Sequence, residues 1–214
     1  MKQVFTGKHG ICVEESTVPA LLANSLLIRV AYSCISAGTE MSSVKAAGKS
    51  LLQKAWEDPG KVMQVLDILR AKGVKAAQSK INSAVEKLTP IGYSVSGTVV
   101  ATGSGVEGIF AGDKVSAGGA GFAVHAGFVV VPYNLVVKIP TDSDLRSAAC
   151  GTVGSIAMQG VRRAALSIGE NAVVFGVGLI GLLTLQILKA AGIHVACVDI
   201  DPDRLELARR LGAE

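Results

Sequence analysis

The sequence predicts an α/β protein in which a β-rich, partly open barrel with a helical insertion precedes the first half of a doubly wound parallel sheet. Three observations predict this fold. Short strand-like segments separated by glycine turns fill the first part of the chain, and two amphipathic helices interrupt them. Near the end, a glycine-rich turn joins a strand to a helix. Hydrophobic residues make up 50% of the chain and there are 25 glycines, which suits parallel strands joined by tight turns.

The first part of the chain carries short strand signals separated by turns. Residues 93–102 alternate in the manner of a half-buried strand, and the Gly-Asp turn at residues 112–113 leads into another strand. We expect a helix over residues 147–165 to link this β-rich domain, residues 1–168, to a nucleotide-binding domain over residues 169–214. Further strands are predicted at residues 26–32, 126–131 and 135–139.

A polar insertion at residues 44–88 interrupts the predicted strands. Two apolar runs follow the spacing of one helical face, so two amphipathic helices are predicted on either side of Gly73. The insertion holds nine basic residues against four acidic ones, a larger surplus than the net charge of +4 on the whole chain. Two interpretations stay open: solvated helical faces, or a site for an anionic substrate such as a nucleotide-linked sugar, or for a docking partner. The apolar runs are Val62, Val65, Leu66 and Leu69, then Ile81, Ala84, Val85 and Leu88.

The most specific motif is a G-x-G-x-x-G turn inside a strand–helix–strand unit. Gly176 allows the tight turn, Gly178 lets the backbone approach a pyrophosphate, and Gly181 allows close packing of helix on strand. The helix is expected at residues 182–191 and the second strand at residues 194–198. The sequence therefore predicts a dinucleotide site.

An acidic residue follows the second strand, about twenty residues past the last glycine. Asp199 can accept hydrogen bonds from the diol of an adenosine ribose, and its charge would repel a 2′-phosphate. The free backbone N–H groups at Leu179 and Ile180 face the position of the phosphates. The predicted cofactor is therefore NAD(H) rather than NADP(H).

Other classes of protein fit less well. The apolar stretch at residues 172–188 approaches the length of a membrane span, but three glycines, Thr184 and Gln186 interrupt it. The N-terminus has no apolar signal segment, and the four scattered cysteines form no C-x-x-C pair, so a reducing cytoplasm is expected. The mild charge and few aromatic residues disfavour nucleic-acid binding.

Several motifs together resemble the medium-chain dehydrogenase/reductase family, the relatives of zinc-type alcohol dehydrogenase. They are residues 37–40 (Ala-Gly-Thr-Glu), 97–100, 112–115, 198–201 and 204–208. The closest resemblance is to the bi-domain oxidoreductase branch. It implies a GroES-like N-terminal domain, a Rossmann domain, and hydride transfer to or from an alcohol, a ketone or an activated alkene, including a sugar-linked one. Arg204 matches a basic family position near the ribose.

The chain departs from this family at the zinc ligands. The three catalytic ligand positions correspond to Ala37, Tyr93 and the neighbourhood of Thr152, two residues from Cys150. The four-cysteine structural zinc loop is missing as well. We therefore expect neither a catalytic nor a structural zinc. A meeting of Cys34, Cys150 and His125 in space is conceivable, but for His125 we favour a structural role.

Without a metal, another electrophile must stabilise the oxyanion during hydride transfer. The resemblance places Tyr93 where the family has a histidine ligand, and Thr39 where it has the hydroxyl of a proton relay. We hypothesise that both line the substrate cleft and that Tyr93 donates to a carbonyl oxygen. The alternative is that Tyr93 only packs at the start of its strand.

The chain carries one mononucleotide half, whereas a doubly wound domain has two. We therefore expect the N-terminal part of a longer oxidoreductase, or a truncated product. A homo-oligomer is conceivable for the full-length protein, and the oligomeric state itself stays open. The alternative function is a non-catalytic dinucleotide-binding or interaction module.

Overall fold

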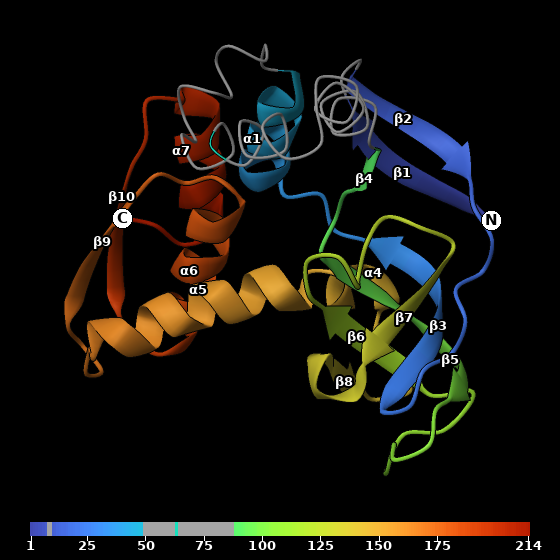
Figure 1. Ribbon diagram of the computed structural model, residues 1–214. Helices are drawn as coiled ribbons and strands as arrows, with labels where there is room; N and C mark the ends of the chain where they lie inside the picture. Colours follow the sequence, from blue (N-terminus) through green and yellow to red (C-terminus); the bar gives the residue numbers. More distant parts are fainter. Residues whose placement is uncertain (8–9, 49–62, 64–87) are drawn as a thin grey trace.

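The structure is a computed structural model, and it describes residues 1–7, 10–48, 63 and 88–214. A β-rich half and a nucleotide half lie at the two ends of helix α5 (Gly151–Ala164), as Figure 1 shows. The α/β class, with a GroES-like N-terminal domain followed by part of a Rossmann domain, is confirmed. The two amphipathic helices predicted inside residues 44–88 lie outside the described residues, apart from the end of α1 (Ala37–Gly48) and residues 63 and 88.

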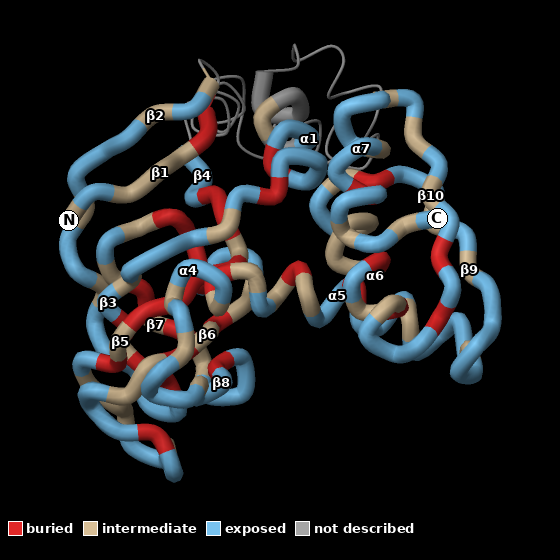
Figure 2. Tube along the Cα trace, turned by 180° about the vertical axis from the view of Figure 1, so that it is seen from behind, coloured by how far each residue is buried: buried red, intermediate tan, exposed pale blue. Residues whose placement is uncertain are grey.

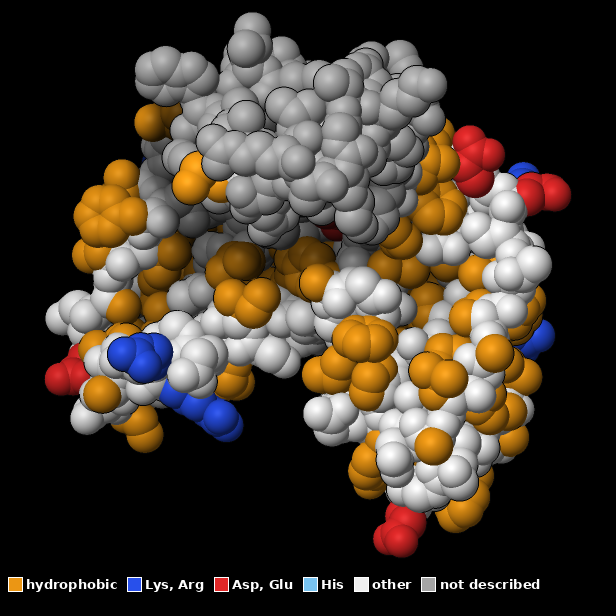
Figure 3. Space-filling view, viewed as in Figure 1, with side chains coloured by type: hydrophobic (Ala, Val, Ile, Leu, Met, Phe, Trp, Pro, Cys, Tyr) orange, Lys and Arg blue, Asp and Glu red, His pale blue; other side chains and the backbone are white. Residues whose placement is uncertain are grey.

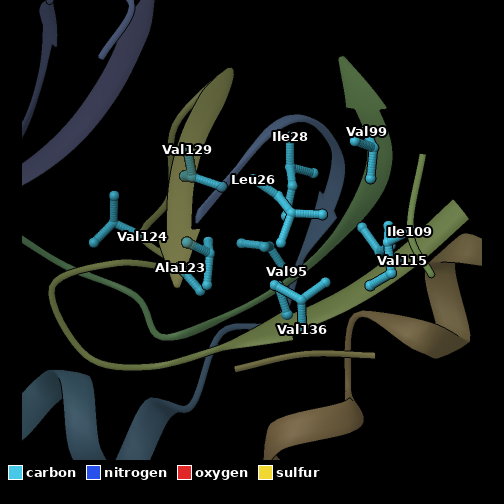
Figure 4. Packing of buried hydrophobic residues seen from close by; sticks show 12 residues of the cluster. Leu26, Ile28, Val95, Val99, Ile109, Val115, Ala123, Val124, Val129 and Val136 are labelled. Carbon is cyan, nitrogen blue, oxygen red and sulfur yellow. The ribbon is translucent and has the colours of Figure 1, made fainter. Parts of the chain in front are cut away.

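An antiparallel five-stranded sheet forms the centre of the β-rich half, in the order β7-β3-β5-β6-β8. Its apolar side chains, mostly valine and isoleucine, interdigitate in one cluster that includes Leu26, Ile28 and Val95 (Figure 4). In the tube view, buried residues are numerous on these strands (Figure 2). The strands are β3 (Ser25–Ser33), β5 (Ser94–Thr102), β6 (Lys114–Gly118), β7 (Phe128–Pro132) and β8 (Val136–Lys138), with a 3-10 turn at Tyr133–Leu135 before β8.

A second sheet in the same half has the order β2-β1-β4, and the sequence motifs did not predict it. Strands β1 (Lys2–Gly7) and β2 (Gly10–Glu15) pair antiparallel over six residue pairs, and β4 (Thr89–Pro90) pairs with the far end of β1. The backbone of Val4 donates to the carbonyl of His125 at 2.8 Å, which attaches this sheet to the larger one.

The alternating sequence of β5 predicted a half-buried strand, but the strand is not half-buried along its whole length. Its first four residues are all buried, and α4 (Leu145–Ala148) and α5 both contact this strand. The hydroxyl of Ser94 donates to the carbonyl of Ala149 at 2.6 Å, and that of Ser96 donates to the carbonyl of Leu145. Serines are tolerated here because their hydroxyl groups find backbone acceptors.

The predicted helix at residues 147–165 forms as two helices. Helix α4 (Leu145–Ala148) begins where the Asp144 carboxylate accepts hydrogen bonds from the backbone N–H groups of Arg146 and Ser147. After a break of two residues α5 continues the path, and it ends where Ala165 adopts a left-handed conformation with φ of 50°.

In the nucleotide half, β9 (Asn171–Phe175) and β10 (His194–Val198) pair in parallel. Helix α6 (Leu179–Ala190) packs on one face of this pair, and α7 (Pro202–Arg210) follows β10. The other face is open to solvent, and Phe175 there is 79% exposed. Figure 3 shows hydrophobic side chains on the outer surface of this half. Among the described helices, none combines the length and apolarity that crossing a membrane requires.

Candidate active site

The glycine-rich loop has the geometry that its sequence predicts. Gly176 has φ of 86°, a left-handed conformation that favours glycine, and its N–H donates to the carbonyl of Val198 at 2.8 Å. A Cβ on Gly181 would lie 2.0 Å from the carbonyl oxygen of Gly176, whereas a Cβ on Gly178 would meet no atom within 4 Å. The first and third glycines therefore let the loop and helix pack closely, and the middle one leaves open space where a phosphate can approach.

Helix α6 begins at Leu179, three residues earlier than the sequence analysis placed it. Gly178 is its N-cap, and no side chain caps the backbone N–H groups of its first turn. Leu179 and Ile180 are 39% and 38% exposed, so the start of the helix is open to solvent. Uncapped N–H groups and the positive end of the helix dipole together favour a bound phosphate.

Asp199 lies at the end of β10, beside the glycine loop. Its carboxylate accepts a hydrogen bond from the N–H of Val177 at 2.7 Å and another from the N–H of Asp201 at 3.0 Å. The bonds from Asp201 and Val177, in that order, hold the pKa of Asp199 below its usual range, and the nearby charge of Arg204 lowers it further. The Arg204 side chain itself pairs with Asp201 at 3.2 Å. The carboxylate is therefore ionised and fixed beside the loop before any ligand binds.

A series of contacts leads from the neighbour of Thr39 in the sequence to the neighbour of Tyr93, and Thr39 and Tyr93 are the proposed catalytic residues. Next to Thr39 in α1, the Glu40 carboxylate bonds to Nε2 of His125 at 3.0 Å. The ring of His125 packs so closely on Gly92 that a Cβ there would approach it to 2.9 Å. Gly92 directly precedes Tyr93, which is partly buried, while Thr39 is exposed. These contacts bring the start of α1 next to the start of β5.

His125 is buried and its partner is Glu40, so the structural role expected for it agrees with the geometry. The second carboxylate oxygen of Glu40 accepts from the N–H of Ser36 at 2.9 Å. With the imidazole proton on Nε2, the ring donates to Glu40, and Nδ1 has no hydrogen-bond partner among the described residues. Glu40 was noted only as part of a motif, and its pairing with His125 was not predicted because the two residues are 85 positions apart.

A cavity of about 540 Å³ lies beside the backbone of Tyr93. The carbonyl of Tyr93 accepts from the N–H of Gly119 at 3.0 Å and from the Thr152 hydroxyl at 3.4 Å, and both donors line the cavity. A Cβ on Gly118 would lie 2.5 Å from the Thr152 hydroxyl oxygen, so only glycine allows this approach of β6 to α5. The Tyr93 side chain is not among the lining residues. No sequence pattern predicted this cavity, because its walls come from three separate segments.

The side chains at the zinc-ligand positions do not fit a catalytic zinc. The contact between Thr152 and Tyr93 brings two of these positions together, but the three residues are alanine, tyrosine and threonine. Zinc sites are built from cysteine, histidine and carboxylate ligands. In the described part of the chain, no group of three or more such side chains is arranged to hold a metal ion. Cys34 and Cys150 do meet, with their sulfur atoms 3.8 Å apart, but His125 bonds to Glu40 instead.

The β-rich half joined to a glycine-loop unit agrees with the resemblance to the alcohol dehydrogenase-like medium-chain dehydrogenases and reductases, and known proteins share sequence or fold with this chain. D-guloside 3-dehydrogenase of Escherichia coli is 28% identical over 219 residues, which cover 100% of this chain and 58% of that protein. (R,R)-Butanediol dehydrogenase of Bacillus subtilis is 32% identical over 150 residues, 58% of this chain and 42% of that protein. Galactitol-1-phosphate dehydrogenase from Escherichia coli has a TM-score of 0.75 at 22% identity, covering 100% of this chain and 60% of that one.

These relatives confirm the resemblance to the medium-chain, alcohol dehydrogenase-like enzymes. No model of a known family matches the chain. The chain spans about half the length of the curated relatives that it matches. It corresponds to 42% of the butanediol dehydrogenase and to 58% of D-guloside 3-dehydrogenase.

Proposed function

We propose that this chain is the cofactor-binding and substrate-binding part of a zinc-independent, NAD(H)-dependent oxidoreductase that acts on an alcohol or ketone. The observation that carries the proposal is the glycine loop, with open space at Gly178 and the ionised Asp199 beside it. Relatives named as dehydrogenases of a guloside and of butanediol support a substrate with neighbouring hydroxyl groups, including a sugar-linked one.

The preference for NAD(H) over NADP(H) follows from the negative charge of Asp199. Asp199 keeps free lone pairs on both carboxylate oxygens for the ribose hydroxyls, since each oxygen accepts one backbone hydrogen bond. A 2′-phosphate would place a second negative charge next to it, so NADP(H) is disfavoured. One structural neighbour, a mycobacterial protein solved with NADPH, has a TM-score of 0.72 at 20% identity and shows only that the fold is shared.

NAD(H), when bound, would supply or accept the hydride. We assign the binding of the pyrophosphate, the hydrogen bond to the substrate and the proton relay to residues of this chain. The uncapped N–H groups of Leu179 and Ile180 hold the pyrophosphate, and the Tyr93 hydroxyl donates a hydrogen bond to the reacting carbonyl oxygen. Thr39 relays the proton between that oxygen and solvent. The substrate is a small molecule, and we propose a cytoplasmic protein that forms a homo-oligomer when complete, without nucleic-acid or membrane partners.

Titration of NADH and NADPH tests the nucleotide site. We expect the chain to bind NADH, and Asp199→Ala to weaken that binding by roughly ten- to hundredfold, because hydrogen bonds to a charged group are lost. Asp203→Ala removes the same charge from an exposed position on α7 and should leave the affinity unchanged. Fluorescence titration measures both variants. Equal affinity of the chain for NADH and NADPH would contradict the assigned role of Asp199.

Substitution of Tyr93 by phenylalanine tests the catalytic assignment. We expect kcat to fall by roughly 10²–10³, because one donor to the oxyanion is removed, while the affinity for NADH stays the same. Tyr32→Phe, at an exposed tyrosine on β3, is the matched control. Steady-state kinetics of the whole protein with sugar alcohols and diols measure the effect. Unchanged kcat would remove Tyr93 from the mechanism.

A second candidate function is a dinucleotide-binding module without catalysis. The absence of usual zinc ligands at Ala37, Tyr93 and Thr152 favours it. NADH binding without turnover of any alcohol, ketone or sugar, in the whole protein, would support this alternative.

A further inference from the structure

Two thiols from distant parts of the sequence lie close together near Ser94, the first residue of β5. Cys34 follows β3 and Cys150 is the N-cap residue of α5, 116 positions later. Their sulfur atoms lie 3.8 Å apart. A disulfide bond has a sulfur–sulfur distance of about 2.05 Å, so the two sulfur atoms must approach each other by less than about 2 Å to form it.

One buried residue holds both cysteines in place. The carbonyl of Ser94 accepts from the N–H of Cys34 at 2.9 Å, and the Ser94 hydroxyl donates to the carbonyl of Ala149 at 2.6 Å. The same hydroxyl oxygen accepts from the N–H of Thr152 at 3.2 Å. Ser94 is 1% exposed, so these bonds are shielded from water. The backbone on either side of the thiol pair is therefore preorganised, which keeps the effective concentration of one thiol near the other high.

The environments of the two thiols differ. Cys150 is the N-cap residue of a 14-residue helix, and its thiol donates a hydrogen bond to the Cys34 sulfur. Burial, followed by the hydrogen bond with Cys150, raises the pKa of Cys34 to about 11, so this thiol stays protonated at neutral pH. Both side chains are partly exposed, and the neighbouring Ile35 is 69% exposed, which gives a small oxidant access.

We propose that Cys34 and Cys150 form an oxidant-sensitive dithiol site that hydrogen peroxide converts into an intramolecular disulfide. The Cys150 sulfur attacks the peroxide, the O–O bond breaks, and Cys150 becomes a sulfenic acid while the thiol proton leaves with the released oxygen as water. The Cys34 sulfur then attacks the sulfenic sulfur, and water leaves with the Cys34 proton. Counting the Cys150 proton as well, two thiols and one hydrogen peroxide give one disulfide and two waters.

The disulfide would join two elements that flank the proposed active site. Cys34 lies three residues before α1, which carries Thr39, and Cys150 lies two residues before Thr152, which lines the cavity. Helix α5 runs from this point to the nucleotide half (Figure 1). The bond would hold the start of that helix against the β-rich half, so we expect the oxidised chain to unfold at a higher temperature than the reduced chain.

Peptide mapping after oxidation tests the proposal. The chain is treated with hydrogen peroxide in the presence of a chelator, its remaining thiols are blocked with an alkylating reagent, and it is digested with trypsin without reductant. We expect a linked pair of peptides, residues 30–45 and 147–162, that a reductant separates. The double variant with Cys12→Ser and Cys197→Ser should form the same linked pair at the same rate.

Single variants and a thermal scan complete the test. Cys34→Ser should leave Cys150 as a sulfenic acid, which dimedone traps, and should abolish the rise in melting temperature on oxidation. Links that involve Cys12 or Cys197 instead, or conversion of Cys150 to sulfinic acid without any link to Cys34 in the parent chain, would overturn the proposal. Because none of these measurements depends on NAD(H) or turnover, failure here is distinguishable from failure of the proposed function.

Discussion

His125→Leu is expected to lower the free energy of unfolding by about 3–5 kcal/mol, because it leaves a buried carboxylate without its partner. The side chains of His125 and Glu40 are only 9% and 10% exposed. After the substitution, the carboxylate keeps the bond from the Ser36 backbone alone. Urea denaturation followed by far-UV circular dichroism measures the loss.

Two further variants test whether stability depends on the hydrogen bond between His125 and Glu40 or on the packing of the two side chains. His125→Gln can still donate to Glu40 and should cost only about 1 kcal/mol. Glu40→Met combined with His125→Leu removes both polar partners, and we expect it to recover part of the lost stability, as apolar replacement of buried ion pairs often does. A single His125→Leu variant as stable as the parent chain would show that the pair has little effect on folding.

Gly181→Ala is expected to disrupt the nucleotide loop. The added Cβ would lie 2.0 Å from the carbonyl oxygen of Gly176, and backbone atoms must move to relieve the overlap. We expect a stability loss of about 1–3 kcal/mol, typical of overpacking. The affinity for NADH should fall more than tenfold, because the loop and the helix N-terminus move apart.

The matched control is Gly160→Ala in the middle of α5, where an added Cβ meets no atom within 4 Å. Alanine has the higher helix propensity, so this variant should be as stable as the parent chain or slightly more stable. Thermal unfolding and NADH titration distinguish the two substitutions. Normal NADH affinity in Gly181→Ala would mean that the phosphates do not bind at this loop.

The nucleotide half was predictable because its main features depend on residues that are close together in the sequence. The glycine spacing, the apolar strand and the acidic residue each depend on neighbours within about twenty positions. In the structure Gly176 forms the turn, Gly181 lies in the first turn of α6, and Asp199 lies beside the loop. The start of α6 was placed too late, since its N-cap residue is Gly178, which has no capping side chain to mark the start of the helix at Leu179.

The β-rich half was less predictable because its decisive contacts are long-range. The pair of Glu40 and His125 and the pair of Cys34 and Cys150 join positions 85 and 116 residues apart. The full burial of Ser94 and Ser96 also depends on carbonyl groups of α4 and of the residue that follows it, which no pattern within β5 reveals. For Thr39 and Tyr93, the sequence suggested a shared neighbourhood only through the family resemblance.

The two bonds on Asp199 have a consequence for how cofactor preference can change during evolution or design. The carboxylate that would bind the ribose also accepts the N–H of Val177 in the glycine loop. A substitution that made room for a 2′-phosphate would therefore release the loop as well. We therefore expect variants that lack the acceptor, such as Asp199→Ala, to bind both cofactors poorly unless a second change satisfies the Val177 N–H.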